Sequence, residues 1–221
     1  MLKEKKASLL FDIDNTLVDR DAAFHAYMLD FISRNQAAFF EEDMSQVLAK
    51  MLALDCHGRK DRKHFCHEVL QDFPGLPYTV ESLWEDHMSM PDFVKPDSAL
   101  NAMLERLSAD YQLMILSNGS ANMQRRKLHQ AGLAAYFEHI FISGEVGYAK
   151  PDARLFSHAL SYAHHDSIVM IGDDYINDMQ PAMAMQLTTV FINPESETVA
   201  VRPDHQLSGI HDLEEALACM I

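Results

Sequence analysis

Short apolar runs alternate with amphipathic spacings along most of the chain. The runs with the length and composition of buried strands are 7–12, 112–116, 139–142, 167–171 and 188–192. The segments with helical periodicity between and after them are 100–107, 121–131, 155–163, 176–185 and 213–220. Strands that are apolar on both faces and separated by helices are typical of a parallel sheet covered on both sides. We therefore predict an α/β fold, a Rossmann-like parallel sheet with helices on both faces.

Residues 18–92 depart from this alternation because they contain no convincing strand. Apolar residues recur there every three or four positions, around 24–32, 44–52 and 80–88. The simplest interpretation is an all-helical insert between the first strand and the rest of the sheet.

Composition and charge narrow the classes of function. The chain has 221 residues, enough for one domain with an insert, and a formal net charge of −15. Nucleic acid polymers and anionic membranes both require a basic surface, so neither is an expected partner. A small anionic substrate remains compatible, since a local lysine or metal ion can reverse the field in a pocket. The three cysteines form no even disulfide framework, and the start lacks the apolar stretch of a signal peptide, so we expect a cytoplasmic protein.

Two carboxylates stand where the first predicted strand ends. Asp12 and Asp14 are two residues apart, so on an extended chain they point the same way. Carboxylates held close together repel unless a cation lies between them or one carries a proton. The alternative is a solvated turn, in which Thr16 or Asp19 caps the following helix. This stretch alone favours a functional site only modestly.

Polar groups also follow three other predicted strands, at the edge where open α/β sheets bind ligands. Each has a structural explanation as a turn former, a surface charge or a helix cap, but their coincidence at four strand ends favours one shared site. The residues concerned are Ser117 with the backbone amides of Asn118 and Gly119, Lys150 before Pro151, and Asp173, Asp174 and Asp178.

These motifs together resemble the haloacid dehalogenase (HAD) superfamily in their order and spacing. They are DIDNT at 12–16, SNG at 117–119, KP at 150–151 and GDDYIND at 172–178. The resemblance covers nearly the whole chain, and the helical insert resembles the family's helical cap. It implies a core domain at 1–17 and 93–221 and a cap domain at 18–92.

The resemblance also implies catalytic roles. Asp12 would be the nucleophile that forms an aspartyl-phosphate. Asp14 would protonate the leaving oxygen and then activate the water that hydrolyses this intermediate. Lys150 would offset the charge of the nucleophile and the phosphate. Such a division replaces one difficult displacement by two easier ones.

The remaining implied roles concern substrate and metal. Ser117 and the amide of Asn118 would hold phosphate oxygens, with Thr16 and Gly119 as further substrate-binding candidates. Mg²⁺ prefers oxygen ligands and is typically shared with a substrate phosphate. Its implied ligands are Asp12, the backbone carbonyl of Asp14, Asp173 and Asp178. Asp174 either competes for the metal or caps a helix.

We therefore predict a Mg²⁺-dependent phosphatase that acts on a small phosphorylated metabolite: phosphoglycolate, a sugar phosphate or a nucleoside monophosphate. One alternative is a haloacid dehalogenase, although those enzymes, which otherwise resemble this chain, lack the second acid. Another is a receiver-like signalling domain, which the length and the helical insert disfavour. A zinc site among Cys56, His57, His64, Cys66 and His67 lacks the paired spacing of structural zinc ligands.

Overall fold

The computed structural model describes residues 5–40, 42–192 and 201–220. Residues 1–4, 193–200 and 221 of the predicted core domain, and Glu41 of the predicted cap, lie outside them. Two compact units are present: Met1–Asp19 with Lys95–Ile221, called here the sheet unit, and Arg20–Val94, called the helical unit. Within the described ranges, no helix is both long and apolar enough to cross a lipid bilayer.

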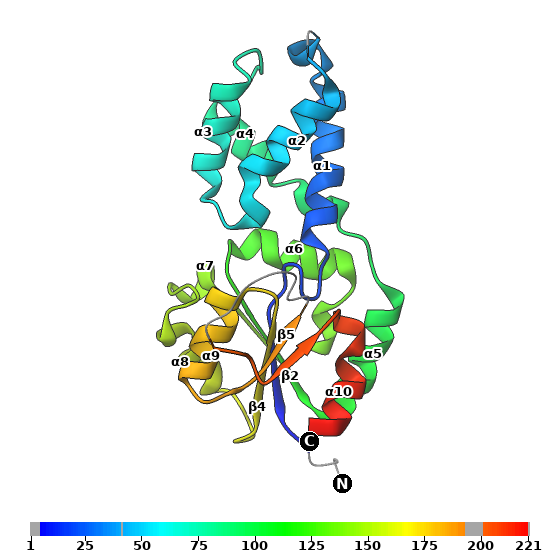
Figure 1. Cartoon of the computed structure of the whole chain (residues 1–221), viewed down its shortest axis with the longest axis vertical. Helices are drawn as coiled ribbons and strands as arrows, with labels where there is room; N and C mark the ends of the chain where they lie inside the picture. The colour runs from blue at the N-terminus through cyan, green and yellow to red at the C-terminus, as the bar shows by residue number, and fades with distance from the viewer. Residues whose placement is uncertain (1–4, 41, 193–200, 221) are drawn as a thin grey trace. The chain divides into compact units, whose positions relative to one another are not determined.

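The sheet unit contains a parallel sheet of six strands in the order β3-β2-β1-β4-β5-β6, which confirms the predicted α/β fold (Figure 1). The strands are β1 (Ser8–Phe11), β2 (Gln112–Ser117), β3 (His139–Ile142), β4 (Ile168–Gly172), β5 (Thr188–Ile192) and β6 (His205–Leu207). The short edge strand β6 was not predicted, because three residues with a polar pair among them carry no strand-like apolar run.

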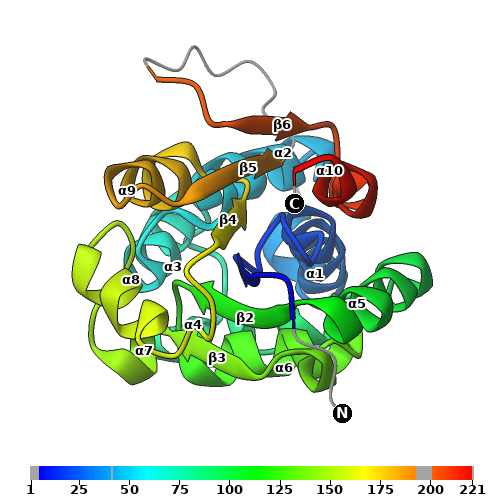
Figure 2. The same cartoon turned by 90° about the horizontal axis from the view of Figure 1, so that it is seen from below.

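Helices cover both faces of this sheet, as predicted. Figure 2 shows α8 and α9 on one side and α5 and α10 on the other. The helices are α5 (Ser98–Asp110), α6 (Ala121–Ala131), α7 (Ser143–Val146), α8 (Ala153–Leu160), α9 (Gln180–Ala184) and α10 (Leu213–Met220). Asp152 caps α8 by accepting a hydrogen bond from the Arg154 amide.

One buried cluster joins the sheet to the helices on the α8 side. Leu10 and Met170 contribute from β1 and β4, and Leu155 and Phe156 contribute from α8. All four side chains are fully buried. Burial of a side chain of this size contributes roughly 1.5–3 kcal/mol, so these contacts hold the strand ends in a rigid frame.

The strand register aligns the chain segments that carry the candidate chemistry. Phe11, the last residue of β1, pairs with Ile115 of β2 and with Ile171 of β4. Because the three strands are parallel, the chain leaves all of them at the same edge of the sheet. Asp12, Ser117 and Asp173 therefore come together through the backbone alone.

The helical unit contains no strand among its described residues. Its helices are α1 (Arg20–Arg34), α2 (Met44–Asp55), α3 (Arg62–Asp72) and α4 (Val80–His87). Aromatic rings fill its interior, where Phe24 packs against Tyr27 and Phe65. Side chains cap three of the helices: Asp43 for α2, Asp61 for α3 and Thr79 for α4.

A buried ion pair network ties the start of α1 to the end of α2. Asp55 is 1% exposed and accepts hydrogen bonds from both Nη atoms of Arg20. It also accepts a bond of 2.5 Å from Arg62 Nη1 and one of 2.9 Å from the Gly58 amide. This carboxylate therefore has two guanidinium partners from the same unit.

Candidate active site

Asp12 lies directly after β1, at the centre of the sheet. Its amide donates to the Ile171 carbonyl of β4 at 2.9 Å, so the backbone at Asp12 continues the sheet's hydrogen bonding. The residue is 6% exposed. A carboxylate at this position is aimed by the rigid sheet rather than by a mobile loop.

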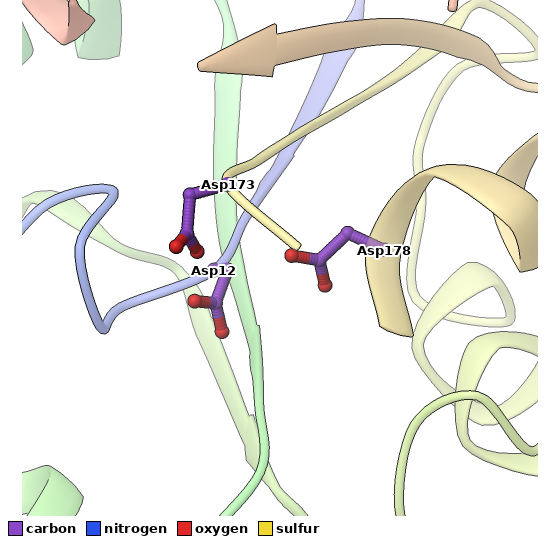
Figure 3. Close-up of side chains that lie close together, drawn as sticks. All are labelled: Asp12, Asp173 and Asp178. Carbon is purple, nitrogen blue, oxygen red and sulfur yellow. The ribbon is translucent and has the colours of Figure 1, made fainter. Parts of the chain in front are cut away.

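Three acids gather at this edge of the sheet. Each of Asp12, Asp173 and Asp178 offers a carboxylate oxygen, and these oxygens all lie within 4.8 Å of one another. Figure 3 shows the three side chains close together on separate segments of the chain. Asp173 follows β4, and Asp178 lies in the π-helical turn Tyr175–Met179. All three are among the metal ligands that the family resemblance implies, and that role stays a prediction.

The cluster holds its protons more tightly than isolated acids would. Burial first, and then the nearby charges of Asp12 and Asp178, raise the pKa of Asp173 to about 8. Burial likewise raises the pKa of Asp178 to about 7, although Lys150 opposes the shift. The pKa of Asp12 is also raised, by burial first and against the charge of Lys150. With all three acids ionised, three carboxylates would share the charge of Lys150, so the cluster favours the binding of protons or a cation.

Lys150 is the cation within the cluster. Its Nζ donates to Asp12 Oδ1 at 2.6 Å and to Asp178 Oδ1 at 2.7 Å, and the residue is 5% exposed. Burial alone would lower the pKa of Lys150, but the two carboxylates raise it above its ordinary value. Lys150 is thus held charged next to the predicted nucleophile.

Asn118 has a role that sequence reasoning did not predict. Its side-chain amide donates to the Lys150 carbonyl at 2.9 Å, and its Oδ1 accepts from the Lys150 amide at 2.7 Å. These two bonds fix the backbone that carries the lysine. The predicted role for Asn118, a backbone amide offered to phosphate, stays a prediction.

Ser117 ends β2 and is 1% exposed, at the same edge as Asp12. The backbone amide of Gly119 already has a hydrogen-bond partner, and its predicted contact with a phosphate stays a prediction. The Gly119 amide donates to Ser143 Oγ at 3.0 Å, because the backbone of the β3–α7 junction packs against the Gly119 loop. A substrate would have to displace that hydroxyl to use this amide.

Asp14 and Thr16 lie in the tight loop that follows Asp12, in which Asn15 has a left-handed φ of 57°. The Thr16 hydroxyl is buried and contacts Asp173 Oδ1 at 3.4 Å. The Asp14 carboxylate contacts Lys127 Nζ at 2.5 Å and Gln124 Nε2 at 3.0 Å. The loop is thus neither a simple solvated turn nor part of the acid cluster.

Asp174 serves as a helix cap in this structure. Its Oδ1 accepts hydrogen bonds from the amides of Ile176 and Asn177, at 2.9 and 3.0 Å. Asp174 is also absent from the group of acids close enough to share an ion. Gly172 makes room for this turn, since an added Cβ would collide with the Asp178 carboxylate.

Gln124 and Lys127 were missed by sequence reasoning, although both are buried and both contact Asp14. They lie on the inner face of α6 with three apolar residues, Met123, Leu128 and Ala131. Two polar residues within an otherwise apolar helical stripe are the signal that could have identified them.

The donor set suits a hard divalent cation. All three clustered ligand groups are carboxylates, and no soft sulfur or imidazole ligand joins them among the described residues. Their pKa values are raised, which is the direction expected for buried carboxylates that lie close together without enough positive charge beside them. Asp12, Asp173 and Asp178 therefore fit Mg²⁺.

Comparisons with known proteins find similar sequences. A sequence profile described as haloacid dehalogenase-like hydrolase matches residues 9–192. N-acylneuraminate-9-phosphatase of Mus musculus is 27% identical over 236 residues, covering 95% of this chain and 93% of that protein. Pyrimidine 5'-nucleotidase PynA of Streptococcus pneumoniae is 26% identical over 231 residues, covering 95% of this chain and 94% of that protein.

A solved structure extends the likeness to the fold. The crystal structure of the HAD-hydrolase YfnB from Bacillus subtilis, bound to magnesium, superposes with a TM-score of 0.77 at 20% identity. The match covers 97% of this chain and 100% of that chain. At this level of identity the likeness shows a shared fold alone.

Proposed function

The chain belongs to the haloacid dehalogenase-like hydrolase family, and we propose that it is a Mg²⁺-dependent phosphatase of small phosphomonoesters. The observation that carries the proposal is the convergence of Asp12, Asp173 and Asp178 around one point, with Lys150 bridging Asp12 and Asp178. The phosphatases among its relatives support the same reaction class.

Asp12 is the proposed nucleophile. Its oxygen forms a bond to phosphorus while the bond from phosphorus to the leaving oxygen breaks, which gives an aspartyl-phosphate. The negative charge of the attacking carboxylate and of the phosphate must be offset for this step to be fast. Lys150, held by hydrogen bond to Asp12 at 2.6 Å, supplies one positive charge.

A bound metal ion would supply the remaining positive charge. Mg²⁺ bound by Asp12, Asp173 and Asp178, with the Asp14 carbonyl as a further proposed ligand, would neutralise the carboxylates and polarise a phosphoryl oxygen.

Asp14 is the proposed acid and base. It gives a proton to the leaving oxygen in the first step, and in the second it takes a proton from the water that attacks phosphorus. Proton transfer by a positioned group contributes about 10²–10⁴-fold to a rate. Ser117 and the Asn118 amide, with Thr16 and Gly119 as further candidates, are proposed to hold the phosphate oxygens.

The proposal includes the assignment of residues 1–17 and 93–221 as the core domain and 18–92 as the cap, and a cytoplasmic location. The substrate class stays as the sequence predicted it: phosphoglycolate, a sugar phosphate or a nucleoside monophosphate. A dehalogenase would not need Asp14, because a halide leaves without a proton, so the acid favours phosphate chemistry.

Purified protein tests the proposal directly. Phosphate release from p-nitrophenyl phosphate should require Mg²⁺, stop on addition of EDTA, and fall by about 10⁴-fold or more in Asp12→Asn. Asp166→Asn, at an exposed position outside the site, is the matched control and should keep full activity. Turnover that survives EDTA or the Asp12 substitution would refute the mechanism, and chloride release from 2-chloropropionate would indicate a dehalogenase.

A screen of phosphometabolites would then identify the substrate. A single phosphorylation event without continued release of phosphate would instead indicate a receiver-like domain.

A further inference from the structure

We propose that Gln124 and Lys127 of α6 are positioning residues that hold the Asp14 carboxylate and the Ser117 hydroxyl ready for phosphoryl transfer. The inference rests on the proposed function, since it concerns the acid and base step of that reaction. It assigns a role to two buried polar side chains that the proposed mechanism does not otherwise use.

The contacts divide between the two residues. Lys127 Nζ donates to Asp14 Oδ1 at 2.5 Å. Gln124 Nε2 lies 3.0 Å from Asp14 Oδ2, 2.8 Å from Ser117 Oγ and 2.9 Å from the Asn118 carbonyl. One helix thus supplies a donor to each oxygen of the proposed acid, and it contacts the proposed phosphate-binding hydroxyl as well.

The burial of these side chains argues against a role in packing alone. Lys127 is 4% exposed and Gln124 is 1% exposed. A buried ammonium costs stability unless it is well paired, and an apolar residue of similar volume would fill the space at lower cost. The side chain of its partner Asp14 is 31% exposed, so the lysine is the buried member of the pair.

Burial of Gln124 also lowers stability, because one of its polar atoms has no hydrogen-bond partner among the described residues. Its Nε2 faces three oxygen atoms, which fixes the orientation of the amide. Its Oε1 has no hydrogen-bond partner among the residues that the structure describes. A buried acceptor without a partner is unfavourable, so the benefit of this residue lies in what its NH₂ group holds.

α6 is a suitable support for such a role. Asp14 lies in a short loop next to Asn15, which has positive φ, so the strand does not set the direction of its side chain. In contrast, α6 begins four residues after Ser117, is capped by Ser120, and ends at Gly132 in a left-handed conformation. Positions 124 and 127 are three apart and so share one face of that helix.

The orientation of the Asp14 carboxylate is important in both steps of the proposed reaction. In the first step the Asp14 proton moves to the leaving oxygen as that oxygen separates from phosphorus. In the second step Asp14 removes a proton from water as the bond between Asp12 and phosphorus breaks. A displacement of about 1 Å in a reacting group can cost about 10²-fold in rate.

The test compares two substrates that differ in how much they need the acid. Phenyl phosphate releases phenol, with a pKa near that of tyrosine, about 10. p-Nitrophenyl phosphate releases a much weaker base that can leave without a proton. Because kcat/KM includes only the steps up to formation of the aspartyl-phosphate, the ratio of kcat/KM for the two esters reports on the acid.

Lys127→Met should lower kcat/KM for phenyl phosphate by roughly 10–100-fold and change it little for p-nitrophenyl phosphate. KM should stay near the parent value, because Lys127 acts on the proposed acid, Asp14. Lys127→Arg, which keeps a cationic donor, should restore part of the loss. Gln124→Met should show the same leaving-group effect and also raise KM for both esters, because Ser117 loses a partner.

Arg125→Met is the matched control from the same helix, since Arg125 is 50% exposed and pairs with Glu145. It should leave both kcat/KM values unchanged. Thermal unfolding with and without Mg²⁺ establishes whether each variant is folded. If Lys127→Met does not fold, the kinetics of Gln124→Met provide the test.

Two failures are distinguishable. A parent protein without phosphatase activity would refute the proposed function. A parent that turns over both esters, with folded Lys127 and Gln124 variants that lose nothing or lose equally on both, would refute the positioning role alone.

Discussion

Both units bury aspartates, but they treat the charge in opposite ways. In the helical unit, Asp55 is enclosed by Arg20 and Arg62. Burial alone would raise its pKa, yet the two arginines hold that pKa below its ordinary value. In the sheet unit, Asp173 and Asp178 have raised pKa values near 8 and 7.

The difference is one of charge balance: Asp55 is paired with two arginines of its own unit, whereas the clustered acids share Lys150. A buried acid whose charge is satisfied by its own unit needs nothing more, and its role is to hold helices together. A group of acids with one lysine between them is unfavourable in the folded state unless protons or a cation bind. Clustered acids with perturbed pKa values therefore indicate a site prepared for a ligand.

Among the substitutions that test this difference between the two units, Asp173→Asn should have the largest effect. Loss of one carboxylate should weaken Mg²⁺ binding and lower phosphate release by about 10²-fold or more, because metal charge stabilisation is worth several kcal/mol. Without metal at pH 8 the variant should unfold at an equal or higher temperature, since like-charge repulsion is relieved. Calorimetry with EDTA and with Mg²⁺, beside a phosphate assay, measures both changes. A variant that loses stability and keeps turnover would reverse the assignment.

Asp55→Asn should have the opposite pattern in the helical unit. It removes the buried carboxylate that accepts from both Nη atoms of Arg20 and from Arg62, which should cost about 3 kcal/mol of unfolding free energy. Urea denaturation followed by circular dichroism measures the loss, and Asp166→Asn again serves as the exposed control. If Asp55→Asn is as stable as the parent protein, the two arginines do not stabilise the unit through this acid.

The pH dependence of stability should differ in sign between the two clusters. The folded acid cluster keeps protons that the unfolded chain releases, so metal-free protein should lose stability as pH rises from about 5 to 8, through the folded pKa values near 7 and 8. Asp55, with a lowered pKa, contributes stability that is present above the ordinary aspartate pKa and is lost as pH falls through its lower folded value.

Melting temperatures between pH 5 and pH 8, in EDTA and in Mg²⁺, test the first of these trends. Saturating Mg²⁺ should remove most of the fall, because the cation replaces the protons. The fall should also be smaller in Asp178→Asn. A metal-free protein whose melting temperature rises steadily to pH 8 would contradict the charge imbalance inferred for the site.

The smallest effect is expected at a surface pair of the helical unit. Arg34 contacts Asp86 at 2.8 Å, a distance similar to those around Asp55, but its side chain is 40% exposed. Solvent and salt screen such a pair, so Arg34→Met should cost less than about 1 kcal/mol, and less still at high salt. Urea denaturation at two salt concentrations measures it. A loss as large as that of Asp55→Asn would mean that burial does not explain the difference between the pairs.

Much of the fold could be predicted because each long strand is apolar on both faces. The runs ending near Phe11, Leu116 and Ile171 place apolar residues at consecutive positions, which is typical of a doubly covered sheet. The edge strand β6 could not be found in this way, since His205 and Gln206 need no apolar partners at a sheet edge.

Some residues of the candidate site could likewise be predicted from the sequence, and others could not. Asp12, Lys150 and Asp173 follow strands or their connections, and a parallel sheet brings such positions to one edge whatever the other side chains are. Gln124 and Lys127 lie inside a helix, where linear spacing cannot say which residues its face will meet. The contact of Gly119 with Ser143 likewise depends on two loops 24 residues apart.

The sequence by itself determined which residues could do chemistry here and at which edge of a sheet they would gather, because hydrophobic periodicity and strand ends are local properties of the chain. Only the tertiary structure decided which charges are satisfied, since a carboxylate's state depends on burial and on cations far away in sequence. Asp55 and Asp178 are both buried aspartates, and what distinguishes them is how much positive charge the folded chain brings beside each.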